Sequence, residues 1–69
     1  GNEERLSNAD AIIGRTGVVS EDIEQNGYGR VALDGDDWKA ESSDGSPIEK
    51  GARVKIISRE SIIITVEKI

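Results

Sequence analysis

Residues 31–40, which read Val-Ala-Leu-Asp-Gly-Asp-Asp-Trp-Lys-Ala, contain the signal that decides the fold. An Asp-Gly pair between two short alternating runs is the strongest local signal for a tight β-hairpin. The run before the pair places Val31 and Leu33 on one face, and the run after it places Trp38 and Ala40 on one face. The stretch therefore predicts two antiparallel strands that bury a shared apolar face.

The rest of the chain divides into similar short runs, because glycines recur at regular intervals. The expected strands cover residues 15–20, 28–33, 37–41, 52–58 and 61–67. A tight turn at Arg59-Glu60 is expected to join the last two. Ile48 is the one apolar residue of the loop 42–51, and we expect it to plug one end of the core. Five short strands without a substantial helix predict an all-β fold, a small five-stranded β-barrel.

The composition favours a core made by strands. The 69 residues include ten Ile, five Val and two Leu, with Trp38 and Tyr28 as the only aromatic residues. Branched side chains of this kind suit a pleated sheet better than a helix. Residues 1–12 are mostly polar and lack a period, so they are expected to form a flexible N-terminal tail or linker. Residues 13–69 are expected to form the barrel domain.

Charge and missing residue types exclude several functions. The net charge is 9 − 14 = −5, whereas a nucleic-acid footprint needs a basic stripe. No run approaches 18 apolar residues, so the sequence predicts no direct membrane insertion by this chain. Without His or Cys, the usual imidazole and thiolate chemistry is absent. The sequence thus predicts no catalytic residue, no cofactor and no metal site.

The residue pattern supports neither a calcium site at the aspartate cluster nor catalysis by the serines. Asp34, Asp36 and Asp37 lack the offsets and the closing glutamate of a calcium loop, and a solvated hairpin turn is expected instead. The serines have no base nearby except lysine, and a loop lysine such as Lys50 is expected to be solvated.

The alternation within the second predicted strand points to a binding surface. Tyr28 and Arg30 lie opposite in phase to Val31 and Leu33, so they are expected to face outward. Tyrosine and arginine are enriched at interaction hot spots, although packing at a strand edge is the alternative for Tyr28. Trp38 is expected to pack into the core, the alternative being a stacking platform.

Two isoleucines point to a second outward patch. Ile57 and Ile63 are out of phase with the core positions of their strands, and pairing through Arg59-Glu60 would place them outward together. The alternative is that Leu6 or Ile12 folds back to cover them. The expected partner-binding residues are therefore Tyr28, Arg30, Ile57 and Ile63.

Four spaced motifs within residues 13–67 resemble the soluble C-terminal domain of NfeD-like membrane proteins. They are Gly14-x-x-Gly17, Gly29-x-Val31, Gly35-x-x-Trp38-x-Ala40 and Ile48-x-x-Gly51-x-x-Val54-x-Ile56. The resemblance implies an OB-type barrel without the usual helix between strands three and four. It also implies a stomatin-, prohibitin- or flotillin-like partner in membrane organisation. The parent protein would be anchored in a membrane by segments outside this chain, with the domain soluble on the cytoplasmic side.

Two other functional classes remain as alternatives. A single-stranded nucleic-acid-binding OB domain would need a basic groove with aromatics, for which the sequence supplies only Tyr28 and a net charge of −5. A biotinyl- or lipoyl-type carrier would need a lysine at a hairpin tip. The expected tips, Asp34-Gly35 and Arg59-Glu60, carry none.

Overall fold

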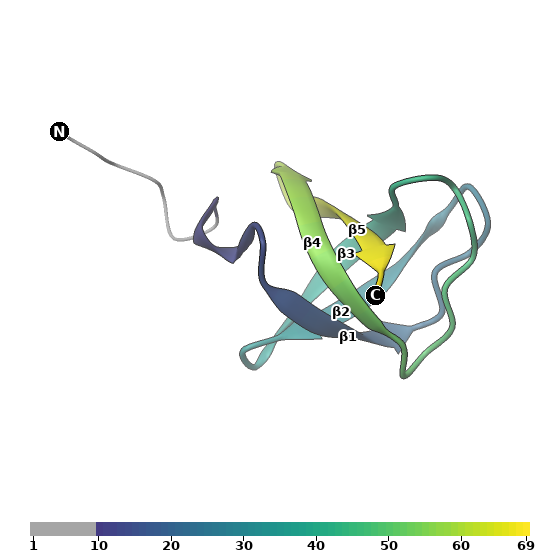
Figure 1. Ribbon diagram of the computed structural model, residues 1–69, viewed down its shortest axis with the longest axis horizontal. Helices are drawn as coiled ribbons and strands as arrows, with labels where there is room; N and C mark the ends of the chain where they lie inside the picture. The colour runs from purple at the N-terminus through teal and green to yellow at the C-terminus, as the bar shows by residue number, and fades with distance from the viewer. Residues whose placement is uncertain (1–9) are drawn as a thin grey trace, which may run out of the picture.

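Five strands close into one barrel in the computed structural model, which describes residues 10–69 (Figure 1). The elements are the 3₁₀ turn η1 (Asp10–Ile12) and the strands β1 (Thr16–Glu21), β2 (Tyr28–Leu33), β3 (Asp36–Ser42), β4 (Arg53–Glu60) and β5 (Ile63–Lys68). The order around the barrel is β1-β2-β3-β5-β4, with β3 and β5 parallel and the other neighbours antiparallel. No helix connects β3 to β4. The predicted all-β, OB-type five-stranded barrel is confirmed.

The β2–β3 hairpin forms where the sequence predicts it. Leu33 pairs with Asp36, which leaves Asp34 and Gly35 as a two-residue loop. Both loop residues have positive φ, 51° and 86°, as the mirror-image turn of a tight hairpin requires. Local chemistry alone therefore fixes the register of this strand pair.

The β4–β5 hairpin differs from the prediction. The expected turn at Arg59-Glu60 is wrong, because β4 continues to Glu60, which pairs with Ile63. The turn is Ser61-Ile62, with Ser61 in the left-handed region at φ 59°. The register shifts at Ile57, where a bulge adds one residue to β4. Ile62, which alternation over the expected strand 61–67 would place on the same face as Ile64 and Val66, lies in this turn and is 70% exposed.

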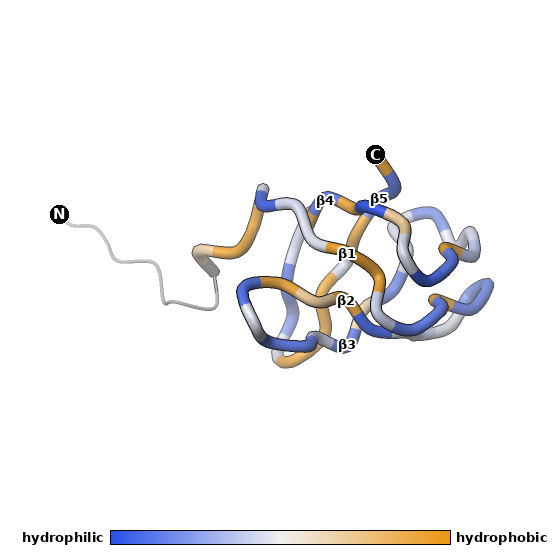
Figure 2. The backbone as a smooth tube through the Cα atoms, turned by 90° about the horizontal axis from the view of Figure 1, so that it is seen from below, coloured by the Kyte–Doolittle hydropathy of each residue, from blue (hydrophilic) through white to orange (hydrophobic). Residues whose placement is uncertain are grey.

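The core runs the length of the barrel and is closed at both ends. Figure 2 shows hydrophobic stretches mainly along the strands and hydrophilic ones mainly in the connections. At one end, the loops 22–27 and 43–51 lie side by side (Figure 1) and bring Ile23 against Ile48 in an isolated antiparallel bridge. The described core residues are Ile12, Val19, Ile23, Val31, Leu33, Ala40, Ile48, Val54, Ile56, Ile64 and Val66. Ile48 plugs the core as predicted.

Near the start of the described chain, Ile12 belongs to the folded part. The expected tail reached residue 12, yet Ile12 is only 9% exposed and is a member of the core. Hydrogen bonds from Arg15 N to Ile12 O and from Gly14 N to Ile56 O hold this segment on β4. Ile12 thus packs into the core instead of covering the outward isoleucines. Leu6, the other residue expected to cover them, lies outside the described residues.

Gly29 allows the β1–β2 connection to cross closely over β2. A Cβ at this position would lie 2.4 Å from Asp22 O and 2.6 Å from Glu21 O, closer than real Cβ contacts come. Both contacts are to backbone, which cannot rotate away. The close approach therefore requires glycine at this position.

Candidate docking surface

The outward sides of β2, β3 and β5 form one continuous surface. Arg30 of β2 is directly opposite Lys39 of β3, and Lys39 is in register with Ile63 of β5. Neighbouring residues in register share a face of the sheet, so these three side chains form a row across three strands. Tyr28 lies beside this row, opposite Glu41. We call Tyr28, Arg30, Lys39 and Ile63 the docking surface.

Two cations stand side by side in the docking surface. Arg30 and Lys39 carry like charges at directly opposed positions, an arrangement that destabilises a sheet. Neither forms an ion pair with a residue in the range 10–69, where the ion pair present is Arg15–Asp34 at 2.9 Å. Lys39 Nζ lies instead 4.6 Å from the centroid of the Tyr28 ring, within range of a cation–π interaction. The surface therefore presents positive charge around an exposed aromatic ring.

Acidic side chains border the docking surface. Glu21 is opposite Arg30 on β1, and Glu60 is opposite Ile63 on β4. Glu41 accepts a hydrogen bond from the hydroxyl of Thr65 at 3.5 Å, which orients its carboxylate toward β5. The cations are thus confined to the middle of the face.

The structure brings together three of the four residues predicted for partner binding. Tyr28 is 48% exposed, Arg30 is exposed, and Ile63 is half-buried on the same outward face. Ile57 is also exposed but lies in the bulge of β4, and Ile63 pairs with Glu60 instead. Ile57 and Ile63 both lie outside the core but are not directly opposite each other. The position of the turn at Ser61-Ile62, two residues beyond the expected one, sets this register.

Sequence reasoning missed Lys39 as part of this surface. Its phase in β3, opposite to Trp38 and Ala40, was a sufficient signal that it faces outward. What the local pattern did not contain was the parallel pairing of β3 with β5, which places Ile63 beside Lys39.

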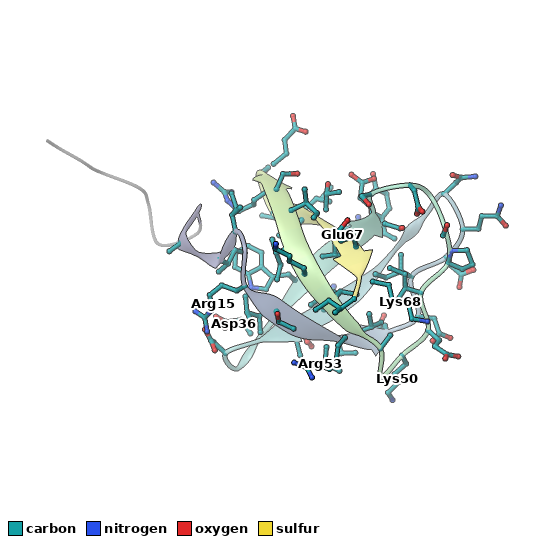
Figure 3. The ribbon with its side chains drawn as sticks, in the orientation of Figure 1. Arg15, Asp36, Lys50, Arg53, Glu67 and Lys68 are labelled. Carbon is teal, nitrogen blue, oxygen red and sulfur yellow. The ribbon has the colours of Figure 1, made fainter. Side chains whose placement is uncertain are left out.

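A groove adjoins the docking surface where β3 begins. Trp38 is half-buried and packs against the core, as predicted, and one side of it faces this groove. Ile62 at the β4–β5 turn supplies the other apolar contact. The residues that line the groove are Arg30, Asp36, Asp37, Trp38, Lys39 and Ile62. Asp36 lies at the end of the barrel opposite to Lys50 and Lys68 (Figure 3).

The opposite end of the barrel carries two open depressions beside Pro47 and Ile48. Asp22, Glu24 and Glu49 line one of them, and both include Lys68. Here the side chain of Asp22 accepts the backbone N–H of Lys50 at 2.7 Å, which ties the two loops together. This carboxylate thus has a structural role.

Asp44 organises the tip of the long loop. Its Oδ1 accepts the backbone N–H of Ser46 at 3.0 Å and the hydroxyl of Ser42 at 2.8 Å. These hydrogen bonds, chiefly the one from the Ser46 backbone, hold the pKa of Asp44 below its ordinary value of 3.8. Ser42 therefore donates to a carboxylate that fixes a turn.

The described residues show neither a metal cluster nor a membrane helix. Across residues 10–69, no three acidic, histidine or cysteine side chains gather closely enough to hold a metal ion. The same range contains no helical segment with the length and hydrophobicity needed to span a bilayer.

Comparison with known proteins identifies the family of the chain. Residues 9–68 match the family model described as the NfeD-like C-terminal, partner-binding domain. An uncharacterised protein of Methanocaldococcus jannaschii is 36% identical over 61 residues, which cover 88% of this chain and 43% of that protein. The chain thus spans less than half the length of this relative.

Solved structures agree with the family match. The C-terminal domain of stomatin operon partner protein 1510-C from Pyrococcus horikoshii is 28% identical, with a TM-score of 0.80, and the alignment covers 94% of this chain and 97% of that one. The soluble domain of a Corynebacterium glutamicum membrane protein, implicated in regulation of membrane protease activity, is 32% identical with a TM-score of 0.77 and coverage of 84% and 92%. With the same barrel, and a family match over nearly every residue, the chain belongs to the NfeD family as its C-terminal, partner-binding domain.

Proposed function

We propose that this chain is a non-catalytic protein-interaction domain of a membrane-anchored NfeD-like protein. Its partner would be a stomatin-, prohibitin- or flotillin-type protein, and the domain would act on the cytoplasmic side in membrane organisation. The family description as a partner-binding domain supports the general role. The name of the Pyrococcus relative, a stomatin operon partner, supports the choice of partner class.

The observation that carries this proposal is the docking surface itself. Tyr28 is exposed and held by Lys39, with Arg30 and Ile63 in the adjacent row. An aromatic ring and an arginine next to an apolar side chain are the residue types that dominate protein interfaces. Because two like charges lie side by side at a cost in stability, a role in recognition accounts for their placement.

Co-purification tests the proposal directly. The tagged 69-residue chain, and the parent protein that contains it, would each be incubated with a stomatin-type protein from the same genome. We expect stoichiometric retention by both, and weaker retention by Tyr28→Ala and by Arg30→Ala. Val18→Ala is the control, because Val18 is 44% exposed on β1 outside the docking surface. Failure of the wild-type chain and of the parent protein to retain any such partner would refute the proposed partner class.

Binding of single-stranded nucleic acid is the second candidate. It is favoured by one observation, the presence of Tyr28, Arg30 and Lys39 on the β2–β3 face. The bordering glutamates and the net charge of −5 oppose it. A titration with mixed oligonucleotides at low salt would support this candidate only if it perturbed residues 28–41 specifically.

A further inference from the structure

We propose that the groove beside Trp38 receives an extended segment of the partner protein that carries one acidic side chain two residues away from an apolar one. This inference rests on the proposed function and specifies the chemistry of the docked segment. The groove is open because β5 pairs with β3 only from Lys39 onward. The first residues of β3, 36–38, therefore have no neighbouring strand on that side.

The floor of the groove is apolar. Trp38 packs one part of its ring on the core and leaves another part accessible, and Ile62 is 70% exposed at the β4–β5 turn. Exposed large apolar side chains that line a common groove are suited to cover by an apolar side chain of a partner. The groove thus has a position for one apolar side chain of a partner, between Trp38 of the β2–β3 hairpin and Ile62 of the β4–β5 hairpin.

The charges at the two ends of the groove differ. Arg30 and Lys39 lie at one end without an ion-pair partner in the described chain, although the protein has more acidic than basic residues. Asp36 and Asp37 lie at the other end, and the hydroxyl of Ser20 donates to Asp37 Oδ1 at 3.1 Å. A carboxylate of the partner would be attracted by the cations, and a second carboxylate further along would be repelled.

This pattern favours a peptide over a nucleic acid. Side chains two residues apart on an extended chain point to the same side and are separated by about 6.6 Å, so one docked segment reaches both the cationic end and the apolar floor with such a pair. A nucleic acid would carry a phosphate at each nucleotide and would bring several of them toward Asp36 and Asp37. A single carboxylate beside an apolar group avoids that repulsion.

The groove contains its own reporter, because Trp38 is the one tryptophan of the chain. The probe is a blocked seven-residue peptide with a glutamate at its fourth position and a leucine at its second and sixth positions, the other positions being glycine or serine. The matched peptide has lysine in place of glutamate. Each would be titrated into the full chain at low salt while Trp38 emission and backbone amide shifts are followed.

We expect the glutamate peptide to bind about five- to tenfold more tightly than the lysine peptide, as two partly exposed ion pairs allow. The shifts should centre on Trp38, Lys39 and Ile62. The variant Arg30→Glu/Lys39→Glu should reverse the preference. The variant Arg53→Glu/Lys55→Glu makes the same change of charge at exposed positions of β4. This control variant should keep the wild-type preference for the glutamate peptide. Thermal unfolding of both variants verifies that each is folded.

The inference would be overturned by no change in Trp38 emission with either peptide, by equal binding of both peptides, or by an equal effect of the two double variants. An oligothymidylate probe that bound at Arg30 and Lys39 in preference to the glutamate peptide would assign the groove to nucleic acid and also overturn it. If a stomatin-type partner binds the Arg30→Glu/Lys39→Glu variant as well as wild type, the inference and the docking surface both fail, while the proposed partner class stands. If wild type binds the glutamate peptide but no such partner, the proposed function fails instead.

Discussion

Ile23 and Ile48 exchange backbone hydrogen bonds between two loops that lie far apart in the sequence. Ile23 N donates to Ile48 O at 2.8 Å, and Ile48 N donates to Ile23 O at 3.0 Å. Both side chains are buried, with 1% and 4% of their surface exposed. This bridge closes the end of the barrel opposite Ile12, and it joins the β1–β2 and β3–β4 connections into one packed unit.

Ile48→Ala should lower the free energy of unfolding by about 2–5 kcal/mol, because it removes a fully packed side chain from the closed end. Denaturant unfolding followed by Trp38 fluorescence measures the change. Ile62→Ala is the matched control, since Ile62 is exposed at a turn and should change stability by no more than about 0.5 kcal/mol. Equal effects of the two variants would contradict the assigned core.

Gly29→Ala should destabilise the protein by about 1–3 kcal/mol, because the added Cβ would meet two backbone carbonyl oxygens. For a domain of this size, each 1 kcal/mol lowers Tm by roughly 4–8 °C. Gly14→Ala separates steric overlap from backbone strain, since Gly14 has φ 91° and open space around it. A thermal scan that found Gly14→Ala the more damaging change would argue against the close crossing over β2.

Asp44→Asn should destabilise the long loop in a pH-dependent way. The folded-state pKa of Asp44 is lowered, so its ionised form adds stability above the ordinary value of 3.8, and this stability is lost as the pH falls through the folded-state pKa. The Tm difference between wild type and variant should therefore be largest near neutral pH and should shrink as the pH falls through the folded-state pKa of Asp44. Paired thermal scans over this range measure it. A constant difference at every pH would exclude the carboxylate hydrogen bonds as its cause.

Tyr28→Ala should weaken partner binding by about tenfold or more with little change in stability, because Tyr28 is the exposed aromatic residue of the docking surface. Isothermal titration calorimetry with the stomatin-type partner measures the affinity. Val18→Ala removes a similarly exposed side chain from β1 and should bind like wild type. Should Val18→Ala weaken binding and Tyr28→Ala leave it unchanged, the partner would dock on β1 instead.

Local sequence chemistry predicts those parts of the fold that depend on neighbouring residues. The Asp34-Gly35 hairpin follows from the backbone preferences of two adjacent residues, and the outward phase of Tyr28 and Arg30 follows from strand alternation. The bulge at Ile57 has no comparable signal, because an extra residue in one strand is defined only against its partner strand. The turn at Ser61-Ile62 likewise depends on how β4 and β5 pair along their whole length.

The sequence predicts only part of the candidate site, because some of its residues meet through pairing between strands that are distant in the chain. Tyr28 and Arg30 share one strand, so their common face could be read directly. Lys39 and Ile63 meet through the parallel pairing of β3 with β5, which are separated in the chain by all of β4. Likewise, Ile23 stands in a polar loop, and its burial depends on the distant Ile48. Contacts of this kind arise from closure of the barrel, which no short stretch of sequence specifies.

The most direct test of the docking surface is an amide-shift map of the isotopically labelled chain titrated with a stomatin-type partner. We expect shifts centred on Tyr28, Arg30, Lys39 and Ile63, extending to the Trp38 indole N–H. We also expect Arg30→Glu/Lys39→Glu to abolish these shifts and Arg53→Glu/Lys55→Glu to leave them unchanged. Shifts confined to the opposite end, around Ile23 and Ile48, or no shifts at saturating partner, would contradict the claim that this face binds the partner.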